Sequence, residues 1–126
     1  MVANNMTYKL DLNTSLQIVE LKYMGTVQLS TRKQARDEVF QMCRTHKISR
    51  ALVDLSNSDI QMSETDAVKF ASAFRDADLP VNYHLACIAN PDNSIENLVQ
   101  TLITIDGINV KYFLDRDEAI AWLTAF

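Results

Sequence analysis

The residues best suited to chemistry lie between Arg50 and Ala67, where an apolar strand pattern runs into a polar loop. Asp54 stands near the end of the strand pattern, and the loop after it is rich in hydroxyl groups. Ser63 then precedes a helical pattern, and Asp66 three residues later gives the spacing of a capping box. These groups could hold or receive a phosphate, but no catalytic constellation accompanies them.

The enzyme classes that use such residues lack their other parts here. Asp54 invites comparison with a phosphoacceptor receiver domain, but no acidic pair follows the first strand to hold Mg²⁺. Lys111 lies inside the last predicted strand rather than at its end. No G-x-S-x-G turn and no glycine-rich phosphate loop occurs. His84 sits within an apolar strand pattern, which favours a core or sheet-face histidine over a general base. We therefore expect a protein that is not an enzyme.

The remaining chemistry-bearing residues predict neither a metal site nor a cofactor site. Cys43 and Cys87 occupy apolar positions without CxxC spacing, which favours buried, reduced thiols over a disulfide. The chain has two histidines and no His/Cys cluster, so a zinc ion has no ligand set.

Composition narrows the class of protein further. The length of 126 residues fits a single domain, residues 1–126. A net charge of −4 argues against general nucleic-acid binding, which needs a basic face. No apolar run approaches the roughly 18 residues of a membrane span, and residues 1–7 lack the order of a signal peptide. We therefore expect a cytoplasmic protein without a membrane span.

Basic residues gather around one predicted helix and are interleaved with acids, which predicts a solvated helix face. These residues are Arg32, Lys33, Arg36, Arg44, Lys47 and Arg50.

Hydrophobic periodicity predicts an α/β fold in the order ββαβαβαβα. Strands are predicted at 8–12, 16–23, 51–55, 83–89 and 110–114. One helix is expected over 31–46 with a Thr31–Gln34 capping box, and others after Ser63, Asn93 and Asp115. The last helix is expected to bury Ala119, Trp122, Leu123 and Phe126. The first two strands form an antiparallel hairpin, and the rest form a mostly parallel sheet covered by helices.

In such a sheet, ligands bind beyond the carboxyl ends of the parallel strands. Three loops are expected to meet there, namely 56–62, 90–93 and the turn at Asp115. Ordinary turn and cap chemistry explains their composition, and the alternative is a partner or ligand surface. The residues of that candidate surface are Asp54, Ser56, Asn57, Ser58, Asp59, Met62, Ser63, Asn90, Asp92 and Asp115.

Two segments carry a resemblance to a known family. V-D-L-S at 53–56 leads into a helix, and the chain closes with F-L-D-R-D-E-A-I-A-W-L at 113–123. Over nearly its whole length the chain resembles the STAS domain of bacterial anti-sigma-factor antagonists, and more closely the small stand-alone SpoIIAA-like proteins. The resemblance implies a STAS-like sandwich and a regulatory role. In phosphorylated STAS antagonists a kinase modifies a serine at the start of the helix after D-L-S, which matches Ser63. In place of the usual D-S-S-G, this chain has M-S-E-T at 62–65.

Three functions follow as expectations. The first is a non-enzymatic regulatory module that binds a protein partner through an exposed surface around 56–66. The alternative is a carrier of a lipid or small apolar ligand, with a pocket walled by Met62, Phe70 and Phe74. The second alternative is an anti-sigma-factor antagonist switched by phosphorylation of Ser63.

Self-association is a further expectation, because the outer strand of the hairpin leaves an exposed edge. Residues proposed to line a homodimer contact are Tyr8, Tyr23 and Phe126.

Overall fold

The computed structural model describes residues 7–126, which form four helices and seven strands. Residues 1–6, where the sequence lacks a signal-peptide pattern, lie outside the described part. The strands are β1 (Tyr8–Asn13), β2 (Ile18–Tyr23), β3 (Gly25–Val27), β4 (Arg50–Asp54), β5 (Ser58–Ile60), β6 (His84–Ile88) and β7 (Asn109–Phe113). The helices are α1 (Leu29–His46), α2 (Glu64–Ser72), α3 (Ser94–Ile105) and α4 (Arg116–Leu123).

Five strands form one mixed sheet in the order β1-β2-β4-β6-β7. β1 pairs antiparallel with β2, and every other pair in this sheet is parallel. β4 therefore lies in the middle, as its nearly unbroken apolar sequence predicts for a strand covered on both faces. The α/β class, the hairpin and the mostly parallel sheet are confirmed.

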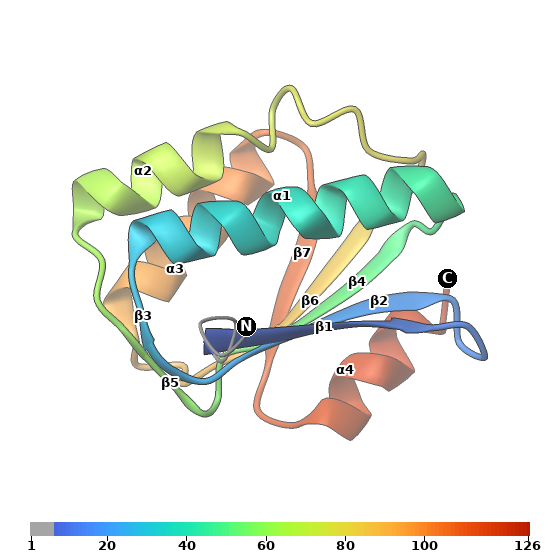
Figure 1. The fold of residues 1–126 in the computed structure, drawn as a ribbon, viewed down its shortest axis with the longest axis horizontal. Coiled ribbons are helices and arrows are strands. Elements are labelled where there is room, and N and C mark those ends of the chain that lie inside the picture. Colours follow the sequence, from blue (N-terminus) through green and yellow to red (C-terminus); the bar gives the residue numbers. More distant parts are fainter. Residues whose placement is uncertain (1–6) are drawn as a thin grey trace, which may run out of the picture.

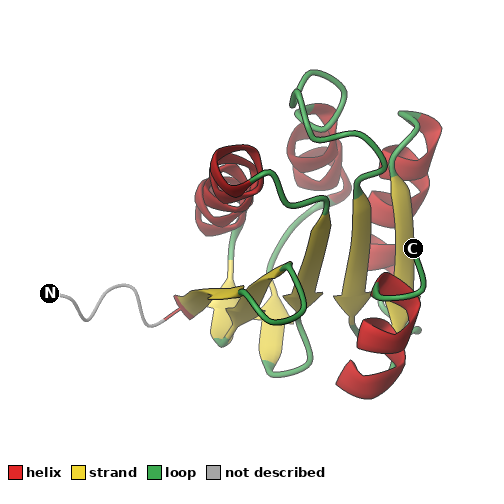
Figure 2. Cartoon of the chain, turned by 90° about the vertical axis from the view of Figure 1, so that its right-hand side faces the viewer, coloured by secondary structure: helices red, strands yellow, loops and turns green. Residues whose placement is uncertain are grey.

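The helices form two unequal layers (Figure 1). α1, α2 and α3 pack with the sheet into the larger core, which includes Val39, Phe70 and Val99. α4 covers the other face alone, where Ala119 and Leu123 are fully buried against Leu52 and Ala86. Figure 2 shows the strands side by side with the helices packed around them. No helix in residues 7–126 is long and apolar enough to cross a membrane.

The structure adds two short strands that the sequence did not predict. β3 and β5 pair in parallel as a separate two-stranded sheet, in register from Gly25 with Ser58 to Val27 with Ile60. Three residues are too few to show a strand period, and their pairing depends on segments thirty residues apart. Gly25 has a φ of 72°, which lets the chain leave β2 and turn into β3.

Two predicted elements begin at other residues than expected, namely the second strand and the first helix. The second strand begins at Ile18 rather than at residue 16, because residues 14–17 form the turn of the hairpin. α1 begins at Leu29, directly after β3, with Gln28 as N-cap and no side-chain cap. Thr31 therefore lies inside the first turn and makes no capping box with Gln34.

The prediction of a solvated basic face on α1 is wrong for Arg32 and Arg36. Their side chains are buried, with 2% and 7% of the residue surface exposed. Arg36 donates a hydrogen bond to the backbone oxygen of Phe70 at 2.8 Å, which ties α1 to α2. Arg32 forms an ion pair with Glu96 of α3, which is 1% exposed.

The Arg32–Glu96 pair is part of a buried polar group beneath the helices. Arg32 donates through both Nη atoms to the Glu96 carboxylate, with Nη2 to Oε1 at 2.7 Å. The hydroxyl of Tyr112 on β7 donates to the same Oε1 at 2.8 Å. The guanidinium lies 4.4 Å from the centre of the Phe70 ring, a cation–π contact. Burial and the neighbouring Cys87 and Glu96 raise the pKa of Tyr112 well above its usual range, so this hydroxyl stays a donor.

Further predictions concern whether single side chains are buried in the core or exposed. Cys43 and Cys87 are buried free thiols, as predicted, and burial raises the pKa of each to about 12. Phe126 is 59% exposed and so does not join the core of α4, which takes only part of the Trp122 side chain. Tyr23 is 1% exposed, so it cannot line a dimer contact.

We expect Glu96→Gln to lower the free energy of unfolding by about 3 kcal/mol, because it leaves the Arg32 cation buried without a counter-charge. The double variant Arg32→Met/Glu96→Gln should lose less than this single variant, since it removes the orphaned charge while Gln can still accept from Tyr112. Urea denaturation of the wild type, both single variants and the double variant gives the coupling free energy. Additive losses would show that the two side chains do not act as a pair.

Candidate functional site

Three polar loops leave the sheet side by side at the carboxyl ends of β4, β6 and β7. Backbone hydrogen bonds continue the pairing one residue past the strands, from the Leu55 N–H to the Ile88 oxygen and from the Ala89 N–H to the Phe113 oxygen. The loops predicted to converge therefore begin on adjacent strands. We call residues 56–66, 90–93 and 115 the carboxyl-end rim.

Asp54 opens the first of these loops and is held by the residue two positions later. Its Oδ1 accepts hydrogen bonds from the Ser56 backbone N–H at 2.9 Å and from the Ser56 hydroxyl at 2.6 Å. The carboxylate lines a depression of about 180 Å³ on the α4 side of the sheet, near Lys22 and Arg116. This side is opposite to α2, so Asp54 does not face the same surface as Ser63.

The segment after Asp54 is exposed but firmly folded. Ser56, Asn57 and Asp59 are exposed and Ser58 is half-buried, and β5 within this segment pairs with β3. The Ser58 hydroxyl donates to the Leu55 oxygen at 2.7 Å, and the Gln61 backbone N–H donates to the Val27 oxygen at 2.8 Å. The loop therefore presents its polar side chains from a fixed backbone.

Ser63 is the N-cap of α2, as its spacing to Asp66 predicts. Its Oγ accepts from the Asp66 backbone N–H, and the Asp66 carboxylate accepts from the Ser63 backbone N–H, each at 3.1 Å. Two otherwise unpaired N–H groups at the helix start are thus satisfied. Ser63 is exposed, and its neighbours Glu64 and Asp66 are acidic.

Met62 is a correction to the predicted surface. Its exposed fraction is only 9%, and its sulfur lies 3.8 Å from Arg32 Nη1. The side chain points beneath the rim rather than out of it, because the apolar thioether packs on the buried ion pair. Met62 therefore connects the loop before α2 to the core and does not contact a partner in this conformation.

The other two loops are helix starts. The Asn90 side chain accepts from the Asp92 backbone N–H at 2.9 Å, and the Asn93 side chain caps α3 by accepting from the Glu96 N–H at 3.0 Å. Asp115 caps α4 by accepting from the Glu118 N–H at 2.9 Å, and this bond lowers the pKa of Asp115. Asn90, Asp92 and Asp115 are exposed.

The pair Arg32–Glu96 is the part of the site that sequence reasoning missed. The Asn93 cap fixes the first turn of α3 and so places Glu96. Glu96 pairs with Arg32, and the Met62 side chain packs on the Arg32 guanidinium. A signal was present in the spacing: Arg32 precedes Ala35 by three residues, and Glu96 precedes Val99 by three, so each lies on a buried stripe. A charged residue on such a stripe has to find a partner in the core.

The apolar cavity expected for a carrier is small. It holds about 30 Å³ and is lined in part by Phe70, Phe74 and Tyr83, without Met62. That volume suits about one water molecule. Pockets for drug-sized ligands measure roughly 300–1,000 Å³. Among residues 7–126, no group of three or more His, Cys, Asp or Glu side chains is arranged to hold a metal ion.

Comparisons with known proteins agree on the fold. No protein-family model matches the sequence, and no curated protein matches it significantly. An uncharacterised DUF3478-family protein from Shewanella loihica PV-4, described as having a SpoIIAA-like fold, is similar with a TM-score of 0.60 and 18% identity over 98% of both chains. The anti-sigma factor antagonist SpoIIAA in its unphosphorylated form is similar with a TM-score of 0.65 and 13% identity, over 94% of this chain and 99% of that one. The chain has the SpoIIAA-like fold, as its sequence predicts.

We expect Ser63→Ala to cost about 1 kcal/mol of unfolding free energy, because α2 loses its N-cap acceptor. Ser63→Asp should be nearly neutral, since aspartate caps equally well. Ser72→Ala, at the exposed other end of the same helix, is the matched control and should change stability by less than about 0.5 kcal/mol. Equal stability of Ser63→Ala and the wild type in urea denaturation would mean that the capping box contributes nothing.

We expect decanol, an apolar chain without an anionic group, not to raise the melting temperature, because the apolar cavity cannot admit its chain without separating the helices. A ligand that binds only the folded state raises the melting temperature in proportion to its occupancy. A thermal-shift titration at neutral pH measures this. A rise that grows with decanol concentration would support the carrier function instead.

Proposed function

We propose that this protein is a non-enzymatic regulatory module and that its carboxyl-end rim is the surface on which a protein partner docks. The observation that carries the proposal is a polar, exposed surface fixed by three helix caps and by the β3–β5 pairing. A preformed surface binds with little loss of conformational entropy. The shared fold with the anti-sigma factor antagonist SpoIIAA supports a regulatory role.

The charge of the rim indicates the chemistry of the partner. Residues 56–66 contain Asp59, Glu64 and Asp66 and no lysine or arginine, and Asp92 adds a further acid from the second loop. Two cations beside the rim have acidic partners, since Arg32 is buried with Glu96 and Arg116 pairs with Glu20 at 2.8 Å. Lys69 lies in the last turn of α2, at the other end of the helix from Ser63. We therefore propose a partner that presents basic side chains, since complementary charge speeds association and sets orientation.

Phosphorylation of Ser63 remains a prediction that fits this surface. A phosphate on Ser63 would lie at the positive end of the α2 dipole, near unpaired backbone N–H groups. It would also displace the capping hydroxyl and add negative charge beside Glu64 and Asp66. The modification would thus alter both the charge of the rim and the start of α2, which are the two features that a partner would contact.

We expect a charge-reversal variant of the rim, Asp59→Lys/Asp92→Lys, to lose partner binding. Both aspartates are exposed, and neither caps a helix. Asp11→Lys/Asp76→Lys is the matched control, because it makes the same change in net charge at exposed positions away from the rim. The measurement is affinity capture of the tagged full chain from its own cells, with quantitative mass spectrometry of what each variant recovers.

A partner of the rim should be recovered with the wild type and the control but several-fold less with Asp59→Lys/Asp92→Lys. Its association rate with the wild type should also fall as salt is raised. If no recovered protein depends on Asp59 and Asp92, the rim is not the docking surface.

A further inference from the structure

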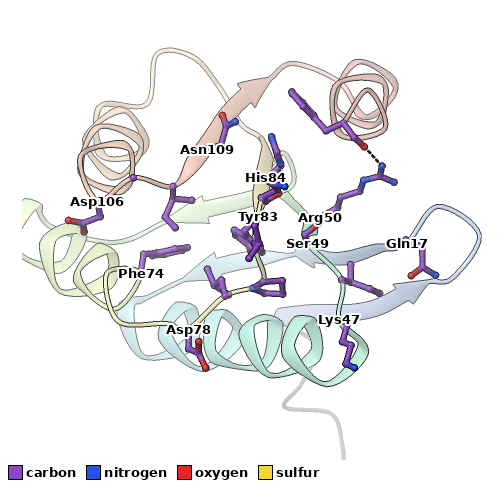
Figure 3. Close-up of a pocket in the computed structure, with 18 of the residues that line it drawn as sticks. Gln17, Lys47, Ser49, Arg50, Phe74, Asp78, Tyr83, His84, Asp106 and Asn109 are labelled. Carbon is purple, nitrogen blue, oxygen red and sulfur yellow. Dashed lines mark hydrogen bonds between the residues drawn. The ribbon is translucent and has the colours of Figure 1, made fainter.

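A large open cleft lies at the opposite end of the sheet from the rim. It measures about 1130 Å³ and is formed at the amino ends of the parallel strands (Figure 3). Its walls come from the turn before β2, the end of α1, the 73–83 segment, the turn after α3 and the chain beyond α4. Figure 3 shows Arg50 and His84 in the middle of the cleft, between Asn109 on one side and Lys47 and Asp78 on the other.

The backbone around this cleft is unusual. Within residues 7–126, the non-glycine residues with positive φ are Gln17 (57°), Lys47 (55°), Asp78 (52°) and Asn82 (63°). All four line the cleft, although they come from three separate segments. Left-handed conformations of residues with a Cβ are unfavourable and concentrate at ligand-binding and active sites. Left-handed backbone at non-glycine residues is therefore confined, within residues 7–126, to the walls of this cleft.

His84 gives the cleft a largely buried imidazole ring, of which one nitrogen has a protein partner and the other has none among residues 7–126. The residue is 7% exposed, and its Nδ1 lies 2.6 Å from the Asn82 carbonyl oxygen. A carbonyl only accepts, so Nδ1 carries the proton and the ring orientation is fixed. The ring stacks on Phe126 with centroids 4.0 Å apart. Among the described residues, Nε2 makes no hydrogen bond, which leaves it for a ligand.

Two cations in the cleft have no carboxylate side chain as a partner within residues 7–126. Arg50 donates to the backbone oxygens of Leu16 at 2.9 Å and Phe126 at 2.5 Å, so its guanidinium is held in place without an acidic side chain. Lys47 is exposed and forms no ion pair. In contrast, Arg75 at the far side of the cleft pairs with Asp106 at 3.3 Å. Asp78 also lines the cleft, so the cleft carries charges of both signs, but Arg50 and Lys47 are not paired with an acidic side chain among the described residues.

The same cleft has an apolar wall. Val81 is 85% exposed and Phe126 is 59% exposed, and both line it. Ile108 also lines it and is half-buried. Apolar side chains of this size usually stay exposed in a concave site when a ligand covers them.

We propose that this cleft binds a small molecule that carries an oxyanion, phosphate or carboxylate, on an aromatic or apolar body. Arg50 and Lys47 hold the oxyanion, because a guanidinium and an ammonium that have no acidic side chain as a partner can form charge-assisted hydrogen bonds with it. His84 Nε2 accepts from a hydroxyl of the ligand or, when the ring is protonated, donates to the oxyanion. Phe126 and Val81 cover the apolar body.

The test is a series of titrations of the ¹⁵N-labelled full chain followed by two-dimensional NMR. Phenyl phosphate and benzoate are the two probes, and they separate the phosphate form of the ligand from the carboxylate form. Inorganic phosphate and phenol supply the anion alone and the ring alone. We expect saturable shifts of the Lys47, Arg50, His84 and Asn109 amides with at least one probe, in the millimolar range. Inorganic phosphate and phenol should bind several-fold more weakly than that probe, since each makes only part of the contacts.

Two matched variants connect binding to the cleft. Lys47→Gln removes one cation, and glutamine tolerates the same backbone, since Gln17 adopts it. Lys33→Gln makes the same change on the exposed surface of α1, away from the cleft. Affinity for the probe should fall several-fold in Lys47→Gln and stay unchanged in Lys33→Gln.

Three results would overturn the proposal: no saturable shift with either probe, shifts centred on the carboxyl-end rim, or equal losses in the two variants. Because the cleft and the rim lie at opposite ends of the strands, failure here leaves the proposed docking surface standing.

Discussion

Arg32 and Glu96 come from the first turns of α1 and α3, and their ion pair joins the helical layer to the loops that leave the sheet. Three features of the structure meet at this pair. The Asn93 cap sets the position of Glu96, Tyr112 of β7 bonds to the same carboxylate, and Met62 packs on the guanidinium from the segment before α2. The exposed side chains of the carboxyl-end rim therefore rest on a charged group that water does not reach.

Such a pair contributes to specificity more than to net stability. Removing two charges from water costs several kcal/mol per ion, and the attraction between them returns most of this only when the geometry is good. Glu96 gains from the positive end of the α3 dipole, whereas Arg32 sits unfavourably at the same end of α1. Arg32 Nε also remains buried without a partner. The arrangement thus favours one relative placement of α1 and α3, because any other leaves both charges unpaired in the core.

The sequence predicted the parts of the fold that local patterns encode. The spacing of Ser63 with Asp66 and of Asp115 with Glu118 located two helix starts, because a cap needs only residues three positions apart. The unbroken apolar run of β4 indicated a central strand. β3 and β5 escaped prediction because each pairs with a strand that is distant in the sequence, and neither is long enough to show a strand period.

The buried pair and the cleft were missed for a different reason, namely that their residues come from distant segments. The spacing of Arg32 to Ala35 indicates a buried stripe but does not identify Glu96, which lies 64 residues away, and the charges interleaved on the same helix favoured a solvated face. The cleft combines Lys47, Arg50, Asn82 and Asn109 from separate elements, and no motif connects them. Only the sheet order, which brings the amino ends of β4, β6 and β7 together, places them around one cavity.

The two ends of the sheet differ in charge and in the kind of molecule they suit. The rim is acidic and lies at three helix starts, whereas the cleft is concave and holds Arg50 and Lys47, which have no acidic side chain as a partner within residues 7–126. β4 and β6 run from one to the other, and five residues of strand span about 16 Å. Substitutions that far apart usually have additive effects.

Any coupling between the ends would have to pass through an element that contacts both, and α1 is such an element. Its first turn holds Arg32 beneath Met62, and its C-cap is Lys47 in the cleft. Since the ion pair with Glu96 holds α1 at one end, a ligand on Lys47 would have to move that whole helix to be sensed at the rim. A helix fixed in one arrangement does not transmit a signal, because transmission requires two alternative states. The structure therefore favours independence of the two proposed sites.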